Sequence, residues 1–375
     1  PASKRRNPPG RACAGGFQYN REMIPGHATA EGTSGFAARF PDASGNGFFR
    51  EANRWTVSSL GLGSYLGERS EECDLAYFSS VVDAFRGGIN FFDSAINYRH
   101  QQSERSIGSA LRKLIRDGEA SREEFVVCSK AGFVTPGALP DFDFAGDDVV
   151  RGIHCMRPDF LTDQVARSRE NFGLDCLDVY YIHNPETQLA DMERAAFLNR
   201  IHRAFEAMET CVSDGWIRAY GVATWDGFRR RDEADPGLQL AELAGIARRV
   251  GGDGHHFRFI QLPYNFGMVE AFAIANQRRG AEAAKNILEM AEDEGIHAVA
   301  SASLLQSRLA RGLPEQTKRL FPGAETDAQR AIQFARGAPH VVSALVGMST
   351  REHVAENLGV ARLAPVSADL YRRLF

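Results

Sequence analysis

The segment Gly88-Ile89-Asn90-Phe91-Phe92-Asp93-Ser94-Ala95-Ile96-Asn97-Tyr98 joins an apolar run to a carboxylate, and a phenol follows five residues later. A short run that is rich in Ile and Phe and follows a glycine pair is typical of a strand buried on both faces. Asp93 would end this strand, and Tyr98 would lie on the loop beyond it. Alone, such an Asp is more often a turn former and such a Tyr more often a packing residue.

Runs of this kind alternate with segments of helical period from about residue 56 onward. Eight runs are predicted as strands, at residues 59–63, 89–93, 125–130, 177–183, 218–224, 257–262, 297–302 and 341–347. The helices are predicted between them, at residues 74–85, 103–115, 160–171, 201–213, 238–250, 281–294 and 327–336. Eight β-then-α units in series need parallel strands with right-handed crossovers, and their closed form is the (β/α)8 TIM barrel. An open doubly wound sheet is the alternative, but the first strand lacks its Gly-x-Gly-x-x-Gly fingerprint.

The predicted organisation is a single α/β domain over residues 55–375. Residues 1–54 are predicted as a largely irregular N-terminal arm, whose beginning is basic and rich in Pro, Gly and Ala. A solvated tail is favoured there, with contact to a nucleic acid or an anionic surface as the alternative. Residues 131–159 form a long loop that contains Phe133, Phe142 and Phe144. Such loops are commonly lids or binding loops, and the chain is predicted to end in a helical tail.

Composition argues against several classes of protein. The 375 residues are 43% hydrophobic and 25% charged, which is ordinary for a globular enzyme. No run approaches 18 apolar residues, so we expect no membrane span. The net charge of −4 argues against a nucleic-acid partner. Six cysteines without paired spacing are expected to be reduced thiols of a cytoplasmic protein, and no spacing typical of a metal site occurs.

Three ionisable side chains end consecutive predicted strands: Asp93 the second, Lys130 the third and His183 the fourth. A solvated lysine and a hydrogen-bonded strand cap are the plain interpretations of the last two. A barrel, however, would bring all three to one mouth beside Tyr98.

These groups have complementary chemistry. A phenol keeps its proton at neutral pH, a nearby ammonium lowers its pKa, and Asp93 would hold Lys130 charged. An imidazole can donate a hydrogen bond to a carbonyl oxygen. The set suits protonation of that oxygen while a hydride reaches its carbon. Because no side chain supplies hydride, a nicotinamide is implied.

With these residues in place, residues 58–357 resemble the aldo-keto reductases. That family has an Asp after the second strand, a Tyr a few residues later, a Lys ending the third strand and a His ending the fourth, and Asp93, Tyr98, Lys130 and His183 match them. Residues 103–111 and 178–185 also look like family signatures. The resemblance implies NADP bound across the mouth, with NAD as the alternative, and a small aldehyde or ketone as substrate. It implies nothing about oligomeric state.

The resemblance also implies a set of cofactor-binding residues. Gln261 matches the glutamine that holds the carboxamide, and residues 347–357 resemble the segment that binds the adenosine phosphate. A helix N-terminus attracts phosphate on physical grounds, although Ser349 and Glu352 also have the spacing of a capping box. The predicted set is Thr224, Gln261, Ser303, Leu304, Gln306, Arg308, Gly347, Ser349, Arg351, His353, Glu356 and Asn357.

Three positions depart from the family pattern. Ala223-Thr224 stands where many members have Ser-Asn, which removes a hydroxyl near the carboxamide. Ser301 stands where many have an aromatic side chain that stacks on nicotinamide. Two extra residues follow Tyr98, so that Arg99 and His100 are candidates for the substrate mouth, with solvent exposure as the alternative.

The leading hypothesis is NAD(P)H-dependent reduction of an aldehyde or ketone, with the proton coming from Tyr98. The first alternative is a nucleotide-binding sensor or regulatory barrel with little turnover. The second is a metal-dependent hydrolase that uses His154, Cys155 and the aspartates of the long loop.

Overall fold

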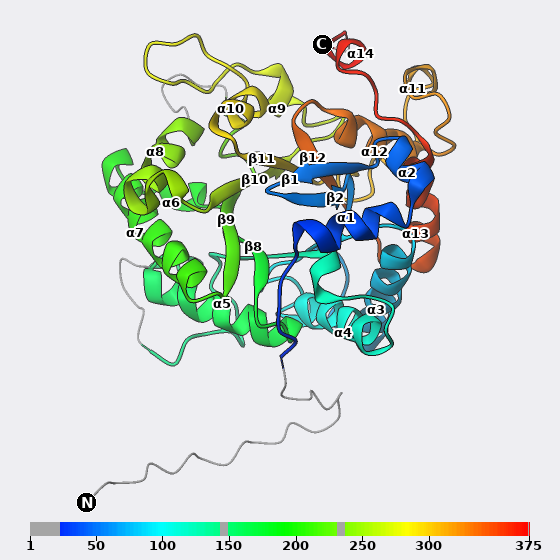
Figure 1. Cartoon of the computed structure of the whole chain (residues 1–375). Coiled ribbons are helices and arrows are strands. Elements are labelled where there is room, and N and C mark those ends of the chain that lie inside the picture. Colours follow the sequence, from blue (N-terminus) through cyan, green and yellow to red (C-terminus); the bar gives the residue numbers. More distant parts are fainter. Residues whose placement is uncertain (1–22, 143–148, 231–236, 374) are drawn as a thin grey trace, which may run out of the picture.

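The computed structural model describes residues 23–142, 149–230, 237–373 and 375. Eight parallel strands close into a barrel, which confirms the predicted fold (Figure 1). The barrel strands are β3 (Leu60–Gly63), β4 (Phe91–Asp93), β5 (Val126–Ala131), β8 (Leu177–His183), β9 (Ile217–Ala223), β10 (Phe257–Pro263), β11 (His297–Ser301) and β12 (Val341–Gly347). All eight predicted strands are present. β4 starts two residues late, at Phe91: the Asn90 N–H donates to the Ser58 hydroxyl at 3.2 Å, and its side-chain amide bonds the backbone of Thr56 and Ser58.

Helices surround the barrel and bury one face against the strands. The long ones are α3 (Glu71–Arg86), α4 (Gln102–Arg116), α5 (Pro158–Phe172), α7 (Arg194–Ser213), α8 (Leu240–Gly251), α10 (Ile287–Glu294) and α12 (Asp327–Gly337). Shorter ones are α6 (Glu186–Leu189), α9 (Glu270–Ala273) and α11 (Gln316–Leu320). The helix predicted over 281–294 begins only at Ile287, because the Asn286 side chain accepts from the Glu289 amide and caps it there.

Two apolar layers form the core. One lies between the strands and the helices. The other fills the barrel with side chains from alternate strand positions, such as Phe91, Val179, Tyr181 and Phe259. The Trp55 ring stacks on Phe259 at 6.1 Å between centroids, so the N-terminal end of the barrel is filled.

Residues 23–54 differ from the irregular arm that was predicted. They form α1 (Ala30–Ala38), α2 (Pro41–Gly45) and β1 (Phe49–Ala52), and β1 pairs with β2 (Trp55–Ser58) across the N-terminal end of the barrel (Figure 1). The cause is long-range anchoring, since the Ala28 amide donates to buried Asp178 at 2.7 Å. Local composition carries no trace of such a contact. Residues 1–22 of the predicted arm, with Cys13, lie outside the described residues.

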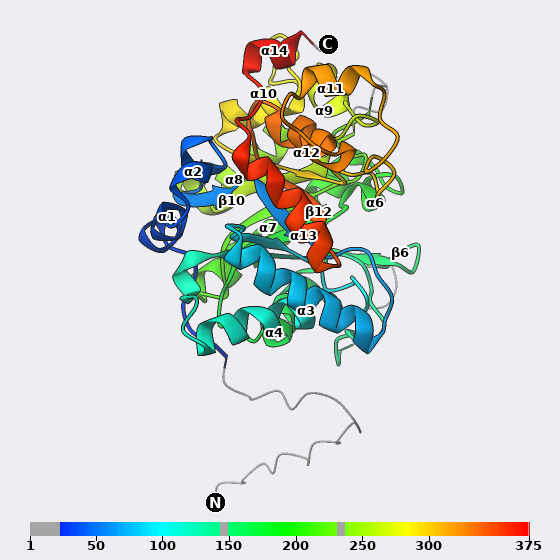
Figure 2. The same cartoon turned by 90° about the vertical axis from the view of Figure 1, so that its right-hand side faces the viewer.

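The long loop and the C-terminal tail hold short elements. Within the loop, β6 (Val149–Val150) and β7 (His154–Cys155) form an antiparallel hairpin. Figure 2 shows β6 at the end of the molecule opposite α1 and α2. The tail contains α13 (Arg351–Asn357), a 3-10 turn (Leu358–Arg362) and α14 (Ala368–Arg372). Across the described ranges, no helix combines the length and the apolarity needed to cross a membrane.

Gly108 allows α4 to pack closely on α5. A Cβ there would lie 2.4 Å from the Phe172 carbonyl oxygen, a backbone atom that cannot move aside. Overpacking of this kind costs about 1–3 kcal/mol. We expect Gly108→Ala to lower the free energy of unfolding by roughly 1–2 kcal/mol in urea denaturation, because helix propensity returns at most about 1 kcal/mol.

Gly245 is the matched control, because it lies inside α8 and a Cβ there would meet nothing closer than Arg249 Nη1 at 3.7 Å. Gly245→Ala should raise the free energy of unfolding by up to about 1 kcal/mol. Equal gains in both variants would contradict the close packing at Gly108.

Candidate active site

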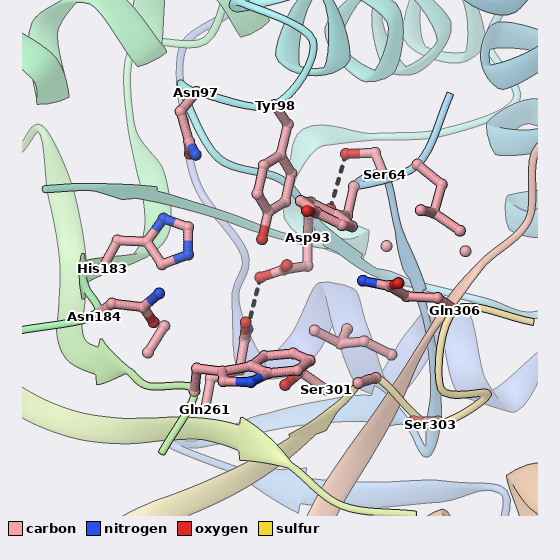
Figure 3. A pocket seen from close by; sticks show the side chains of 18 of the residues that line it. Ser64, Asp93, Asn97, Tyr98, His183, Asn184, Gln261, Ser301, Ser303 and Gln306 are labelled. Carbon is pink, nitrogen blue, oxygen red and sulfur yellow. Dashed lines mark hydrogen bonds between the residues drawn. The ribbon is translucent and has the colours of Figure 1, made fainter. Parts of the chain in front are cut away.

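A cavity of about 440 Å³ opens at the C-terminal ends of the barrel strands. Asp93, Tyr98 and His183 line it, and Figure 3 shows these three side chains pointing toward one another. Lys130 is fully buried behind them and joins the group through Asp93. The structure therefore brings the four predicted catalytic residues together.

Asp93 and Lys130 form a buried ion pair. Lys130 Nζ lies 2.5 Å from Asp93 Oδ1 and 2.6 Å from the Ser94 carbonyl oxygen. Gln261 Nε2 donates to the other carboxylate oxygen at 2.9 Å. Burial raises the pKa of Asp93 against the opposing effects of Lys130 and Gln261. Burial alone would lower the pKa of Lys130, but Asp93 and the other neighbouring groups, Tyr98 among them, together outweigh it and the net shift is upward, so the ammonium stays charged.

Tyr98 stands over this pair. Lys130 Nζ lies 5.0 Å from the centroid of its ring, and the Tyr65 ring meets it edge-on at 5.1 Å. Burial raises the pKa of the Tyr98 phenol and outweighs the lowering by Lys130. Lys130 does act to lower this pKa, as expected, but burial is the larger effect and the net shift is upward. The phenol keeps its proton at neutral pH.

Arg99, one of the two residues expected to enter the mouth, anchors the loop after Tyr98 instead. Arg99 is buried and pairs with Asp74 at 2.9 Å, and it also donates to the hydroxyls of Ser103 and Ser106. Neither Arg99 nor His100 lines the cavity. The prediction that they enter the mouth is wrong, because the guanidinium turns toward α3 and α4, where a carboxylate offsets its charge.

His183 is neutral and close to Tyr98. Burial lowers the pKa of its imidazole well below the usual value, and the ring centroids of Tyr98 and His183 are 5.9 Å apart. Its Nδ1 has no hydrogen-bond partner within the described part of the chain. A neutral imidazole carries one N–H, which can donate to a carbonyl oxygen held beside Tyr98.

The long loop supports His183 from the side. His154 Nε2 bonds the His183 carbonyl oxygen at 2.7 Å, and the Phe133 ring meets the His183 ring at 5.1 Å and 89°. His154 Nδ1 accepts from Gln188 at 3.1 Å, so His154 is a structural residue. The described residues hold no group of three metal-binding side chains, and Phe144, Asp147 and Asp148 of the loop lie outside them.

Six of the twelve predicted cofactor-binding residues line the cavity, and the other six do not. Thr224, Gln261, Ser303, Leu304, Gln306 and Gly347 line the cavity. Arg308, Ser349, Arg351, His353, Glu356 and Asn357 do not, and the last four belong to α13.

The N-terminus of α13 differs from the predicted capping box. Thr350 caps this helix by accepting from the His353 amide at 3.3 Å, so Ser349 lies one residue before the cap. The exposed Arg351 pairs with Asp83 on α3. His353 is also exposed, and Asn357 is buried.

Two buried hydroxyls on the cavity wall lack partners. Thr224 Oγ1 and Ser303 Oγ are satisfied by no atom of the described residues. Buried polar atoms are normally hydrogen-bonded, so these two suit a polar ligand such as a carboxamide. Together with Gln261 they fit the nicotinamide end of the implied cofactor.

Sequence reasoning missed several lining residues. Tyr65, Leu66, Asn97, Asn184 and Trp225 all line the cavity. Each follows shortly after a barrel strand, so extending the strand-end rule to uncharged side chains would have found them.

Glu186 holds the loop that carries Trp225. Its Oε1 accepts from the amides of Trp225 at 2.7 Å and Asp226 at 3.3 Å. Arg229 donates to the Trp225 carbonyl oxygen at 3.3 Å and pairs with Glu270 at 3.0 Å. The backbone that carries the exposed indole is therefore held by hydrogen bonds at both its amide and its carbonyl group.

Comparison with known proteins identifies the family. Residues 59–374 match the family model of the aldo/keto reductase family, so the chain belongs to this family. It is similar to the NADH-specific methylglyoxal reductase of Escherichia coli, with 30% identity over 193 residues that cover 50% of this chain and 53% of the relative. The chain spans about half the length of the first curated relatives it matches.

Solved structures have the same fold. An aldo-keto reductase of Bacillus halodurans, in its holo form, aligns with a TM-score of 0.59 and 17% identity over 87% of this chain and 94% of that one. An aldo/keto reductase of Klebsiella pneumoniae, solved with NADP and acetate, aligns with a TM-score of 0.58 and 21% identity over 86% and 92%.

Burial raises the pKa of Glu186 to about 7, so this carboxyl group keeps its proton in the folded chain to a higher pH than in the unfolded chain. Its contribution to stability is therefore present at low pH and is lost as the pH rises toward 7. We expect the free energy of unfolding of Glu186→Gln, relative to wild type, to rise by about 2 kcal/mol between pH 5 and pH 7.5. Urea denaturation at the two pH values measures this change.

The exposed residue Glu315 supplies the control for this pH dependence. Glu315→Gln should follow the wild type at both pH values. A Glu186→Gln variant that also runs parallel to the wild type would show that the carboxyl group is not perturbed.

Proposed function

We propose that this protein is an NAD(P)H-dependent reductase that converts an aldehyde or ketone to the alcohol. The observation that supports it best is the protonated phenol of Tyr98 over the buried Asp93–Lys130 pair, beside the neutral imidazole of His183. Each group has one task in such a reaction, and the cavity in front of them takes a small molecule.

The roles follow from the contacts. His183 donates a hydrogen bond that orients the carbonyl oxygen toward Tyr98. The Tyr98 hydroxyl gives its proton to that oxygen as negative charge develops there. The Lys130 ammonium, 5.0 Å from the ring centroid, stabilises the phenolate that remains. Asp93 is a positioning residue, because its contact with Lys130 keeps the ammonium charged and fixed.

The cofactor would lie against the wall of the cavity that is formed at the C-terminal ends of β9, β10 and β11. Bound nicotinamide supplies the hydride that the carbonyl carbon receives. Thr224 and Ser303 would satisfy their buried hydroxyls on its carboxamide, and Gln261 borders the same wall.

NADP is the proposed form of the cofactor, with NAD as the alternative. Arg351 and His353 are exposed side chains near the start of α13 that suit a 2′-phosphate, although Asp83 already engages Arg351. NADP is bound in the Klebsiella pneumoniae structure, whereas the Escherichia coli relative is NADH-specific.

A sensor or regulatory barrel is the second candidate. Ser301 lines the cavity and offers no ring on which a nicotinamide could stack. A nucleotide that binds without being turned over would be compatible with this wall.

Replacing Tyr98 by Phe removes the proton donor and little else. We expect Tyr98→Phe to lower kcat for aldehyde reduction by roughly 10²- to 10⁴-fold while NADPH binding stays near the wild-type value. Oxidation of NADPH at 340 nm gives the rate, and protein fluorescence gives the affinity. Tyr220→Phe is the control, since this phenol is buried and does not line the cavity. Unchanged turnover by Tyr98→Phe would refute its role, and tight NADPH binding without turnover of any aldehyde would favour the sensor.

A further inference from the structure

Large exposed apolar side chains gather at the mouth of the cavity. Among the described residues, eight large hydrophobic side chains are exposed, and three of them line this cavity: Tyr65 at 56%, Leu66 at 39% and Trp225 at 43%. Exposed apolar surface that borders a cavity is typical of a ligand-binding surface. The mouth therefore favours contact with an apolar group.

Aromatic rings also flank both side chains that would face the reacting oxygen. The Tyr65 ring meets Tyr98 at 5.1 Å and 72°. The Phe133 ring meets His183 at 5.1 Å and 89°. When Tyr98 and His183 hold the carbonyl oxygen of a substrate, the substituents on the carbonyl carbon lie close to the Tyr65 and Phe133 rings. Edge-to-face contacts with such rings favour a planar aromatic substituent.

A negatively charged group on the substrate would find no free cation to pair with in the described lining of the cavity. No Lys or Arg lines it in the part of the chain that the structure describes, and its lining includes the Asp93 carboxylate. Lys130 is already paired with Asp93, and burial keeps His183 neutral. A carboxylate or phosphate on the substrate would lose its hydration here and gain no ionic partner. Near Tyr98 and His183, the polar side chains that line the cavity include the neutral amides of Asn97 and Asn184.

We propose that the substrate is a neutral aryl aldehyde or aryl ketone, whose ring packs against Tyr65 and the apolar mouth while its oxygen faces Tyr98 and His183. The inference rests on the proposed reductase function. In the reaction, NAD(P)H is oxidised by giving a hydride to the carbonyl carbon, and Tyr98 gives its proton to the oxygen. The product is a neutral aryl alcohol.

A panel of aldehydes separates ring, charge and reactivity. The full chain with NADPH is assayed with benzaldehyde, cyclohexanecarboxaldehyde, 4-carboxybenzaldehyde and propanal. We expect kcat/KM for benzaldehyde to exceed that for the other two ring compounds by about tenfold or more. Tyr65→Ala should lower kcat/KM for benzaldehyde about tenfold more than kcat/KM for propanal, mainly through KM. Tyr65→Phe, which keeps the ring, should stay within about threefold of wild type.

Leu66→Arg tests the charge argument by gain of function. It adds a cation at the exposed rim, so the ratio of kcat/KM for 4-carboxybenzaldehyde to that for benzaldehyde should rise about tenfold. Binding is measured separately by calorimetry on the NADPH complex, with benzamide and 4-carbamoylbenzoate as analogues that are not reduced. Wild type should bind benzamide more tightly, and Leu66→Arg should narrow the difference.

The outcomes separate the two proposals. The substrate class is overturned, and the reductase function stands, if propanal is reduced but benzaldehyde is not preferred to cyclohexanecarboxaldehyde. The same holds if 4-carboxybenzaldehyde is used as well as benzaldehyde. No turnover of any aldehyde overturns the reductase function and the substrate class with it. Tighter binding of 4-carbamoylbenzoate than of benzamide contradicts the neutral cavity whatever the rates are.

Discussion

The buried ion pair between Asp93 and Lys130 is the interaction on which the candidate site depends. Two charges removed from water are tolerated only when each offsets the other and the remaining valences are satisfied. Asp93 meets both conditions, because Lys130 holds one of its oxygens and Gln261 holds the other. The pair places a charged ammonium under Tyr98 that could not otherwise remain there. Removing either partner would leave an uncompensated charge in the interior.

The register of the barrel makes this pair. Asp93 of β4 pairs with Cys128 of β5. Lys130 lies two residues beyond Cys128, so its side chain is on the same face of β5 as that of Cys128 and is nearer the mouth. Gln261 comes from β10, on another part of the ring. Residues far apart in the chain thus meet because closure of eight strands gives all their C-terminal ends one common mouth.

The two ends of the barrel have different tasks. Residues 23–58 fill the N-terminal end, with Trp55 stacked on Phe259 and Ala28 bonded to Asp178. The C-terminal end stays open, and its lining consists of loops held by buried polar contacts: Arg99 with Asp74 beside Tyr98, His154 on the His183 carbonyl, and Glu186 under Trp225. Packing thus closes one end of the barrel, while the other end presents polar groups to a ligand.

The sequence by itself determined the barrel and its four convergent side chains, because strand periodicity and the identity of strand-end residues are local properties of the chain. Only the tertiary structure decided what surrounds them. Arg99 turns to a carboxylate on α3, and burial raises the pKa of the Tyr98 phenol by more than Lys130 lowers it. Residues 30–58 gain their helices and hairpin from contacts with distant strands. Burial and long-range partners depend on the closed barrel as a whole, and no local pattern of residues records them.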